Sequence, residues 1–192
     1  KIVPALGTRL RMEFELLLQE KSFSKALKSL QDWGALVLLD EELQNDDNWE
    51  TRLNCALKLG LHPLTGFIAK SPSSHNLAKR LQMPQKQQRL LAASAEFQRL
   101  FSDVYESKEF SKWNPSTWCQ AIESTQCHPD VVAIAICVQH PFQETFLQWL
   151  QDWKQIKSPI SAKELIKKGW EPGPLLKEEL QRLRFQKLDS LY

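Results

Sequence analysis

Residues 8–34 read TRLRMEFELLLQEKSFSKALKSLQDWG, and their apolar residues recur at intervals of three and four. Two stripes result: the first is Leu10, Phe14, Leu17 and Leu18, and the second is Phe23, Leu27, Leu30 and Trp33. Such intervals place side chains on one face of an α-helix. Gly34 follows the second stripe and predicts its end, because glycine readily adopts the left-handed conformation found after helices. The stretch therefore predicts two amphipathic helices.

The same helical pattern continues through the rest of the chain, and strict alternation of apolar and polar residues never lasts long. Proline is favoured in the first turn of a helix. Several prolines precede apolar-periodic segments and predict helix starts there: Pro84, Pro115, Pro129, Pro141 and Pro174. We expect residues 130–139, apolar nearly all round, to form a buried helix. The helix after Pro141 is expected to reach about Lys157. The fold class predicted is all-α, a helical bundle or superhelical array of about ten helices.

Acidic residues are concentrated between Asp40 and Glu50, where six acids occur without a base. We expect this stretch to be a loop, in which Asp47 caps a helix that begins near Trp49 and that Gly60 ends. The pair Asp46-Asp47 leaves two interpretations open, a divalent-ion site or a solvated capping loop. The missing glycine turn and bidentate spacing favour the capping loop.

Basic residues are concentrated further along, although the formal net charge is only +2. Six bases and one acid lie between Lys70 and Arg99, and nine bases and six acids follow from Gln151 to the end. Segregated charge can steer an anionic partner, whereas the alternative is a set of solvated helix faces. The charge shift near Ser158-Pro159 predicts a small C-terminal subdomain. No apolar run has transmembrane length and no targeting pattern occurs, so we expect no membrane association and a cytoplasmic location.

Catalytic motifs are missing from the sequence. It contains no Gly-rich phosphate loop, no Gly-x-Ser-x-Gly elbow, no Asp-x-Asp pair and no adjacent His-Asp pair. Metal-ligand residue types gather at Cys119, Cys127, His128, Cys137 and His140, but tight pairs typical of structural zinc are absent. Cys119 and Cys137 also fit buried helical faces. We expect no catalytic residue, metal or cofactor in this chain.

Two segments carry a resemblance to a known family. The first combines residues 8–18 (TRLRMEFELLL), residues 25–30 (KALKSL) and Trp33-Gly34; the second is residues 159–176 (PISAKELIKKGWEPGPLL). They resemble the neck and tail of class II tRNA nucleotidyltransferases and the related bacterial poly(A) polymerases. Arg9 and Glu13 match the Arg and second Glu of the family's Glu-Arg-x-x-x-Glu helix, whereas Thr8 replaces its first Glu. In the tail, Ser161 and Lys177 replace two glycines.

The resemblance implies neck-like helices in residues 1–60, a helical body in 61–157 and a basic helical tail in 158–192. The catalytic head is absent, and since the sequence starts at Lys1 rather than Met, we expect a piece of a longer protein. The family adds CCA, A alone or a poly(A) tail to RNA 3′ ends, using Mg²⁺ with CTP or ATP. This chain would hold the acceptor stem and T arm of tRNA, or another structured RNA, and would contact the catalytic head. Arg9 and Glu13 would brace the head's nucleotide pocket; otherwise they are an intrahelical pair.

Two basic surfaces are the candidate RNA contacts. One spans a helix–Pro84–helix corner and comprises Lys79, Arg80, Lys86 and Arg89, with Gln85, Gln87 and Gln88 between them as possible donors. The other is in the tail and comprises Lys167, Lys168, Gly169, Trp170 and Gly173. There Gly173 would allow close backbone approach, and the free amides of the last helix would face a phosphate. Solvated corners are the alternative for both.

Two other function classes remain open. A helical protein–protein scaffold without an RNA role would expose an apolar groove and ignore RNA. A free-standing enzyme is disfavoured because no convergent catalytic set exists. Most tryptophans are expected to be core or helix-contact anchors, namely Trp33, Trp49, Trp113, Trp118, Trp149 and Trp153; Trp170, in the basic tail, is the candidate for base stacking.

Overall fold

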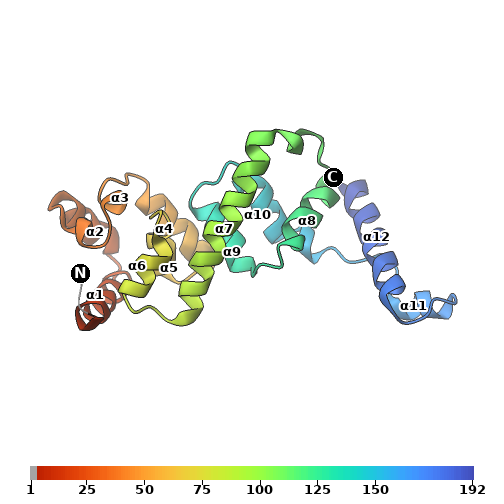
Figure 1. Cartoon of the computed structure of the whole chain (residues 1–192), viewed down its shortest axis with the longest axis horizontal. Coiled ribbons are helices and arrows are strands. Elements are labelled where there is room, and N and C mark those ends of the chain that lie inside the picture. The colour runs from red at the N-terminus through yellow and green to blue at the C-terminus, as the bar shows by residue number, and fades with distance from the viewer. Residues whose placement is uncertain (1–3) are drawn as a thin grey trace. The chain divides into compact units, whose positions relative to one another are not determined.

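The computed structural model describes residues 4–192. Within that range the regular elements are all helices, joined by short loops, and there is no strand (Figure 1). This confirms the predicted all-α class. The α-helices are α1 (Pro4–Leu17), α2 (Phe23–Asp32), α3 (Glu41–Gln44), α4 (Trp49–Lys58), α5 (Pro63–Ile68), α6 (Ser74–Arg80), α7 (Gln85–Ser107), α8 (Pro115–Ser124), α9 (Pro129–Cys137), α10 (Gln143–Gln151), α11 (Ala162–Lys167) and α12 (Pro174–Leu191). Three short 3₁₀ helices join them: η1 (Ala35–Leu38), η2 (Glu109–Lys112) and η3 (Trp153–Gln155).

The chain divides into two compact units. The first comprises residues 1–103 and 127–146, and the second comprises residues 104–126 and 147–192. The helix α7 contributes residues to both units, and so does α10. The predicted division at residues 60 and 157 stays a prediction; the whole predicted tail, residues 158–192, lies within the second unit.

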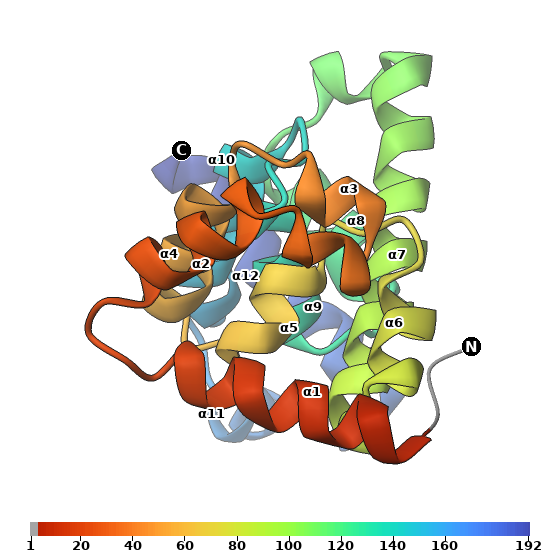
Figure 2. The same ribbon diagram turned by 90° about the vertical axis from the view of Figure 1, so that its left-hand side faces the viewer.

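Close helix contacts in the first unit depend on two glycines. A Cβ atom on Gly66 of α5 would overlap the Cβ of Ala56 in α4, and one on Gly7 of α1 would overlap the carbonyl of Arg80 at the end of α6. Figure 2 shows α1 running alongside α5. Since no other residue is as small, these positions set how closely the helices approach.

The acidic stretch after Gly34 is more regular than the sequence suggested. Gly34 does end α2 in the left-handed conformation, with φ of 72°. The expected loop between Asp40 and Glu50, however, contains α3, and η1 precedes it. Side-chain amides order it: Gln31 donates to the carbonyls of Gln44 and Asp46 at 3.0 Å each, and Gln44 donates back to the Gln31 carbonyl at 2.7 Å. The indole of Trp49 donates to the Gln31 side chain at 3.0 Å.

A buried ion pair lies at the start of α4. Asp46 pairs with Arg52, and the two residues are only 7% and 3% exposed. Arg52 also donates to the carbonyl of Phe67 at 3.1 Å, while Asp46 accepts from the amide of Asn48 at 3.0 Å. The prediction that Asp47 caps this helix is wrong. Asn48 occupies the N-cap position and the preceding Asp46 bonds its amide, whereas Asp47 is exposed.

The core of the first unit centres on α9, whose residues Val131–Cys137 are all buried, as predicted. This helix packs against α4. Next to it, aromatic rings meet edge to face: Phe101 and Phe146 have ring centroids 5.1 Å apart at an interplanar angle of 83°. Phe97 lies 5.2 Å from Phe146. Such pairs add geometric preference to the burial of a large apolar area.

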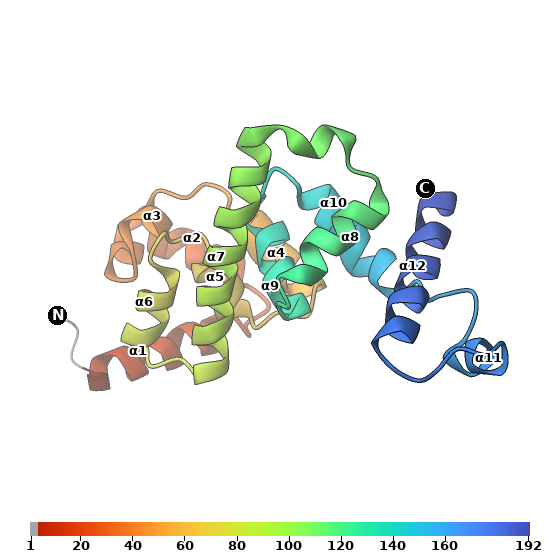
Figure 3. The ribbon, with the colours of Figure 1, turned by 45° about the vertical axis from the view of Figure 1, so that its right-hand side comes forward.

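The second unit is built on α8 and α12, which pack together in opposite directions. At one end, Asp189 of α12 accepts the amide of Ser116 at 2.9 Å and its hydroxyl at 2.8 Å. At the other end, Arg184 of α12 pairs with Glu123 of α8. Figure 3 shows α11 lying at the N-terminal end of α12.

One sequence prediction about the end of α10 and another about Trp33 need correction. The helix expected from Pro141 to about Lys157 ends at Gln151, because the chain tightens into η3 after Asp152. Among the tryptophans, Trp49, Trp118, Trp149 and Trp153 are buried as predicted and Trp113 is half-buried. Trp33 is 78% exposed, since it follows the last residue of α2 and points away from the core.

No helix in residues 4–192 combines the length and apolar character needed to cross a membrane.

Candidate nucleic-acid interface

A basic groove of about 700 Å³ opens in the second unit, between the segment 156–161 and the first half of α12. Three exposed lysines line it: Lys154 from η3, Lys157 from the segment that follows, and Lys177 from α12. Its apolar lining consists of Ile156, Pro159, Ile160 and Leu180. We call this feature the lysine groove. Its lining combines exposed lysines with apolar side chains.

The two carboxylates in the lysine groove are already engaged. Glu123 accepts two hydrogen bonds from Arg184, at 2.7 and 2.8 Å, and a third from the indole of Trp149 at 3.3 Å. Glu164 accepts from the amide and the hydroxyl of Ser161, at 2.8 and 2.7 Å. These bonds hold the pKa of the Glu164 carboxyl below its usual value. Arg184 therefore neutralises Glu123, whereas Glu164 keeps its negative charge and is only held in place by Ser161.

The lysine ammonium groups have no comparable acidic partner. Among residues 4–192, the ion pairs of the second unit involve Arg182 and Arg184, and none involves Lys154, Lys157 or Lys177. Lys154 instead lies 5.9 Å from the ring of Trp149, a cation–π distance that leaves its charge uncompensated. The groove therefore carries an excess of positive charge open to solvent.

The predicted basic surface of the tail, which we call the tail corner, follows the lysine groove in the sequence. It comprises Lys167, Lys168, Gly169, Trp170 and Gly173. Lys167 and Lys168 are exposed at the end of α11, and Trp170 is 36% exposed. Gly169 has φ of 96°, and its amide bonds the carbonyl of Ile166 at 3.0 Å. The amide of Trp170 bonds the carbonyl of Leu165 at 3.1 Å, which completes a Schellman motif. Gly169 is thus explained by helix termination alone.

Gly173 has a different environment. Its φ of 163° is extended backbone, and a Cβ atom placed there would meet nothing within 4 Å. It is the N-cap of α12, Pro174 is the first helical residue, and the carbonyl of Gly173 accepts the amide of Lys177. The fold itself does not require a glycine at this position. The corner and the lysine groove share the first turn of α12.

No family model, curated protein or solved structure matches this chain.

The second predicted surface lies in the first unit, at the corner between α6 and α7. Lys79, Lys86 and Arg89 are exposed there. Arg80, however, donates to the carbonyls of Leu38 and Leu39 and so ties α6 to η1. The side-chain amide of Gln88 is likewise occupied, because it donates to the carbonyl of Met83 at 2.7 Å. Three of the four predicted bases remain available to a partner.

The predicted bracing residues Arg9 and Glu13 are both exposed on α1. The structure gives no ion pair between them, which was the alternative to the bracing role; an i,i+4 pair on this helix joins Arg11 to Glu15 at 3.9 Å. Glu13 lines an apolar groove of about 510 Å³ between α1, α2 and η1, which Leu16 and Leu38 also line. The surface is therefore open for a partner rather than internally satisfied.

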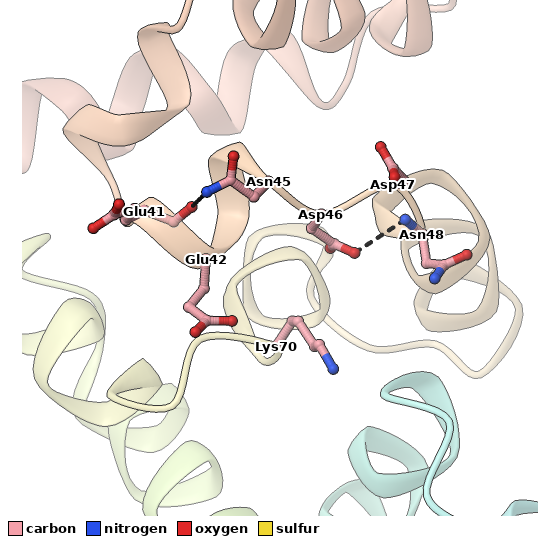
Figure 4. Close-up of a pocket in the computed structure, with 7 residues that line it drawn as sticks. All are labelled: Glu41, Glu42, Asn45, Asp46, Asp47, Asn48 and Lys70. Atoms are coloured by element: carbon pink, nitrogen blue, oxygen red, sulfur yellow. Dashed lines mark hydrogen bonds between the residues drawn. The ribbon is translucent and has the colours of Figure 1, made fainter.

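The acidic stretch forms a pocket of about 440 Å³ (Figure 4). Its carboxylates do not converge. Figure 4 shows Glu41, Asp46 and Asp47 pointing in different directions. Asp46 is also committed to Arg52. Within the described part of the chain, no group of three or more His, Cys, Asp or Glu side chains is arranged to hold a metal.

The groove lysines were not singled out from the sequence. The excess of bases after Gln151 was visible, but three positions spread over 24 residues give no local motif. They converge because the chain turns after η3 and again between α11 and α12. The sequence-predicted tail residues lie in the same unit as these lysines.

Proposed function

We propose that this chain binds structured RNA, tRNA above all, through the lysine groove and the adjoining tail corner. The observation that supports this most strongly is the groove's composition. Three exposed lysines and four apolar side chains line it, and of its two carboxylates Glu123 is neutralised by Arg184, so positive charge exceeds negative charge. Phosphates attract such a rim without regard to base sequence, and binding gains from released counterions.

The tail corner extends the same surface. Amides in the first turn of α12 point toward its N-terminal end, where the helix dipole favours an anion. Lys167 and Lys168 precede this turn, and the open space at Gly173 allows an RNA backbone to approach closely. A folded RNA presents phosphates along a continuous ridge, so two adjacent basic features suit it better than a single small anion.

The parent protein we infer is a cytoplasmic RNA nucleotidyltransferase, either a tRNA nucleotidyltransferase or a bacterial poly(A) polymerase. The resemblance of residues 8–34 and 159–176 supports this. In such a protein Mg²⁺ with CTP or ATP would belong to a catalytic head outside this chain. The apolar groove along α1, with Glu13 at its side, would face that head.

A binding titration tests the proposal. We expect unmodified tRNA to shift this chain in a gel at about 50 mM salt and to lose roughly a hundredfold in affinity by about 200 mM. Exchanging Lys167 and Lys168 for glutamine should flatten the salt slope, and no CTP or ATP should be incorporated by this chain alone. Single-stranded RNA of equal length is the control and should bind more weakly, because recognition depends on shape.

A protein–protein scaffold is the second candidate, and one surface favours it. Trp33, Val37 and Leu38 are all more than half exposed beside the apolar groove of the first unit. Exposed apolar clusters of this kind often contact proteins. If tRNA failed to bind at any salt concentration while folding was intact, the scaffold function would replace the RNA-binding one.

A further inference from the structure

Two cysteines meet inside the first unit. Cys55 on α4 and Cys137 on α9 are 82 positions apart in sequence, yet the thiol of Cys137 donates to the sulfur of Cys55 at 3.1 Å. The helices that carry them pack directly together. Both thiols are free.

The two sulfurs lie in different surroundings. Cys55 is half-buried, and the hydrogen bond from Cys137 lowers the pKa of its thiol to about 7, with Lys58 acting in the same direction. Cys137 is buried, and the pKa of its thiol is raised by its bond to Cys55 and by burial. A thiolate is far more nucleophilic than a thiol, so Cys55 is suited to react first and Cys137 second.

The other two cysteines differ from this pair. Cys119 is fully buried, and burial raises the pKa of its thiol to about 12. Cys127 follows α8 in the sequence and is half-buried. Cys119 therefore serves as an internal reference for an unreactive thiol.

We propose that Cys55 and Cys137 form an oxidant-responsive pair, which a peroxide converts into a disulfide between α4 and α9. The proposal is independent of RNA binding, since it rests on the first unit alone. It assigns a modification site to a pair of residues that otherwise only fill the helix contact.

The reaction balances with hydrogen peroxide as the oxidant. The thiolate of Cys55 attacks one peroxide oxygen, the O–O bond breaks, and Cys55 becomes a sulfenic acid while hydroxide leaves. The sulfur of Cys137 then attacks the sulfenic sulfur, and the S–S bond forms as the S–O bond breaks. The proton of the Cys137 thiol leaves with the hydroxyl group as water. A dithiol such as dithiothreitol reverses the change by exchange.

The second step requires the sulfur atoms of Cys55 and Cys137 to come within bonding distance. A disulfide needs sulfur atoms about 2.05 Å apart and Cβ atoms roughly 3.5–4.5 Å apart. From 3.1 Å, the sulfurs need move only about an ångström, which side-chain rotation on two packed helices can supply. The bond would then fix α4 to α9 and close a loop of more than eighty residues, which raises thermal stability.

The test uses a Cys119→Ala/Cys127→Ser variant, which keeps only the proposed pair. After treatment with hydrogen peroxide we expect both remaining thiols to disappear and the intact mass to fall by two hydrogen atoms. The peptide of residues 53–58 should be found linked to the one containing Cys137, and the melting temperature should rise by several degrees. Dithiothreitol should restore the free thiols, the original mass, the separate peptides and the original melting temperature.

Matched single variants of the full chain complete the test and cover a failure of the double variant to fold. Cys127→Ser should leave the peroxide-induced loss of two thiols unchanged, whereas Cys55→Ser should abolish it. The proposal is overturned if Cys55 accumulates sulfinic acid without a cross-link, or if Cys127 is oxidised while Cys55 and Cys137 stay reduced.

Discussion

Arg184 of α12 and Glu123 of α8 form a two-armed ion pair, with Nη1–Oε2 and Nη2–Oε1 distances of 2.8 and 2.7 Å. The same guanidinium donates to the carbonyls of Ile156 at 2.8 Å and Trp153 at 3.2 Å. One side chain thus holds α8, α12 and the segment after η3 together. Because that segment forms a wall of the lysine groove, Arg184 shapes the groove while its charge is matched by Glu123.

Replacing Arg184 with lysine should destabilise the second unit although the charge is kept. An ammonium cannot reproduce four directed hydrogen bonds, so we expect unfolding to become easier by about 1–3 kcal/mol. Arg182→Lys is the matched control, since Arg182 pairs with Glu179 on the exposed face of α12 and its replacement should leave the free energy of unfolding almost unchanged. Equal midpoints in urea for the two variants would contradict this role of Arg184.

His140 should make the stability of the first unit depend on pH. Burial lowers the pKa of its imidazole, and the Gln98 carbonyl at 3.3 Å opposes this only in part. The amide of Phe142 donates to Nδ1 at 3.2 Å, so the folded state needs a neutral ring. The unfolded chain therefore binds more protons than the folded one, and stability is lost as the pH falls below about 6.5.

Urea unfolding of the wild type at about pH 7.5 and about pH 5.5 checks this, with His140→Gln as the comparison. Glutamine can donate and accept but does not titrate in this range. The wild type should lose more stability on acidification than the variant does. Parallel losses in both proteins would show that other groups cause the change.

Two glycine-to-alanine changes should differ in how strongly they lower the free energy of unfolding. Gly66→Ala brings a methyl group into the Cβ of Ala56 where α4 and α5 cross, so we expect a loss of about 1–3 kcal/mol in unfolding free energy. Gly173→Ala meets open space but replaces a favoured N-cap residue, so it should cost less than about 1 kcal/mol. Thermal melts measure both changes. Under the proposed function, Gly173→Ala should nevertheless weaken tRNA binding, and unchanged affinity would remove Gly173 from the RNA surface.

Helix positions were largely predictable, because the pattern responsible for them is local. The stops at Gly34 and Gly60 and the buried helix after Pro129 are read directly from neighbouring residues. The order in the acidic stretch was missed because it depends on Gln31, whose side chain bonds residues 13 to 18 positions away. The spacing of Trp33 fits a stripe and predicts a core or helix-contact anchor, but spacing does not reveal where a helix face ends.

The candidate site was predictable only in part. The basic tail residues stand in a recognisable motif, so Lys167 and Lys168 could be named from the sequence. Lys154, Lys157 and Lys177 come together through turns of the chain, and the engagement of Glu123 by Arg184 joins residues 61 positions apart. Arg80 shows the opposite case, because a base inside a promising cluster holds two carbonyls of the fold.

The salt dependence of tRNA affinity tests the role of the lysine groove most directly. We compare the wild type with a Lys154→Gln/Lys157→Gln/Lys177→Gln variant and with a control that changes Lys21, Lys25 and Lys112, which are equally exposed but lie outside the groove. The slope of log Kd against log salt should fall by about 2–3 in the groove variant and remain at the wild-type value in the control. If both triple variants show the same slope, tRNA does not use the groove.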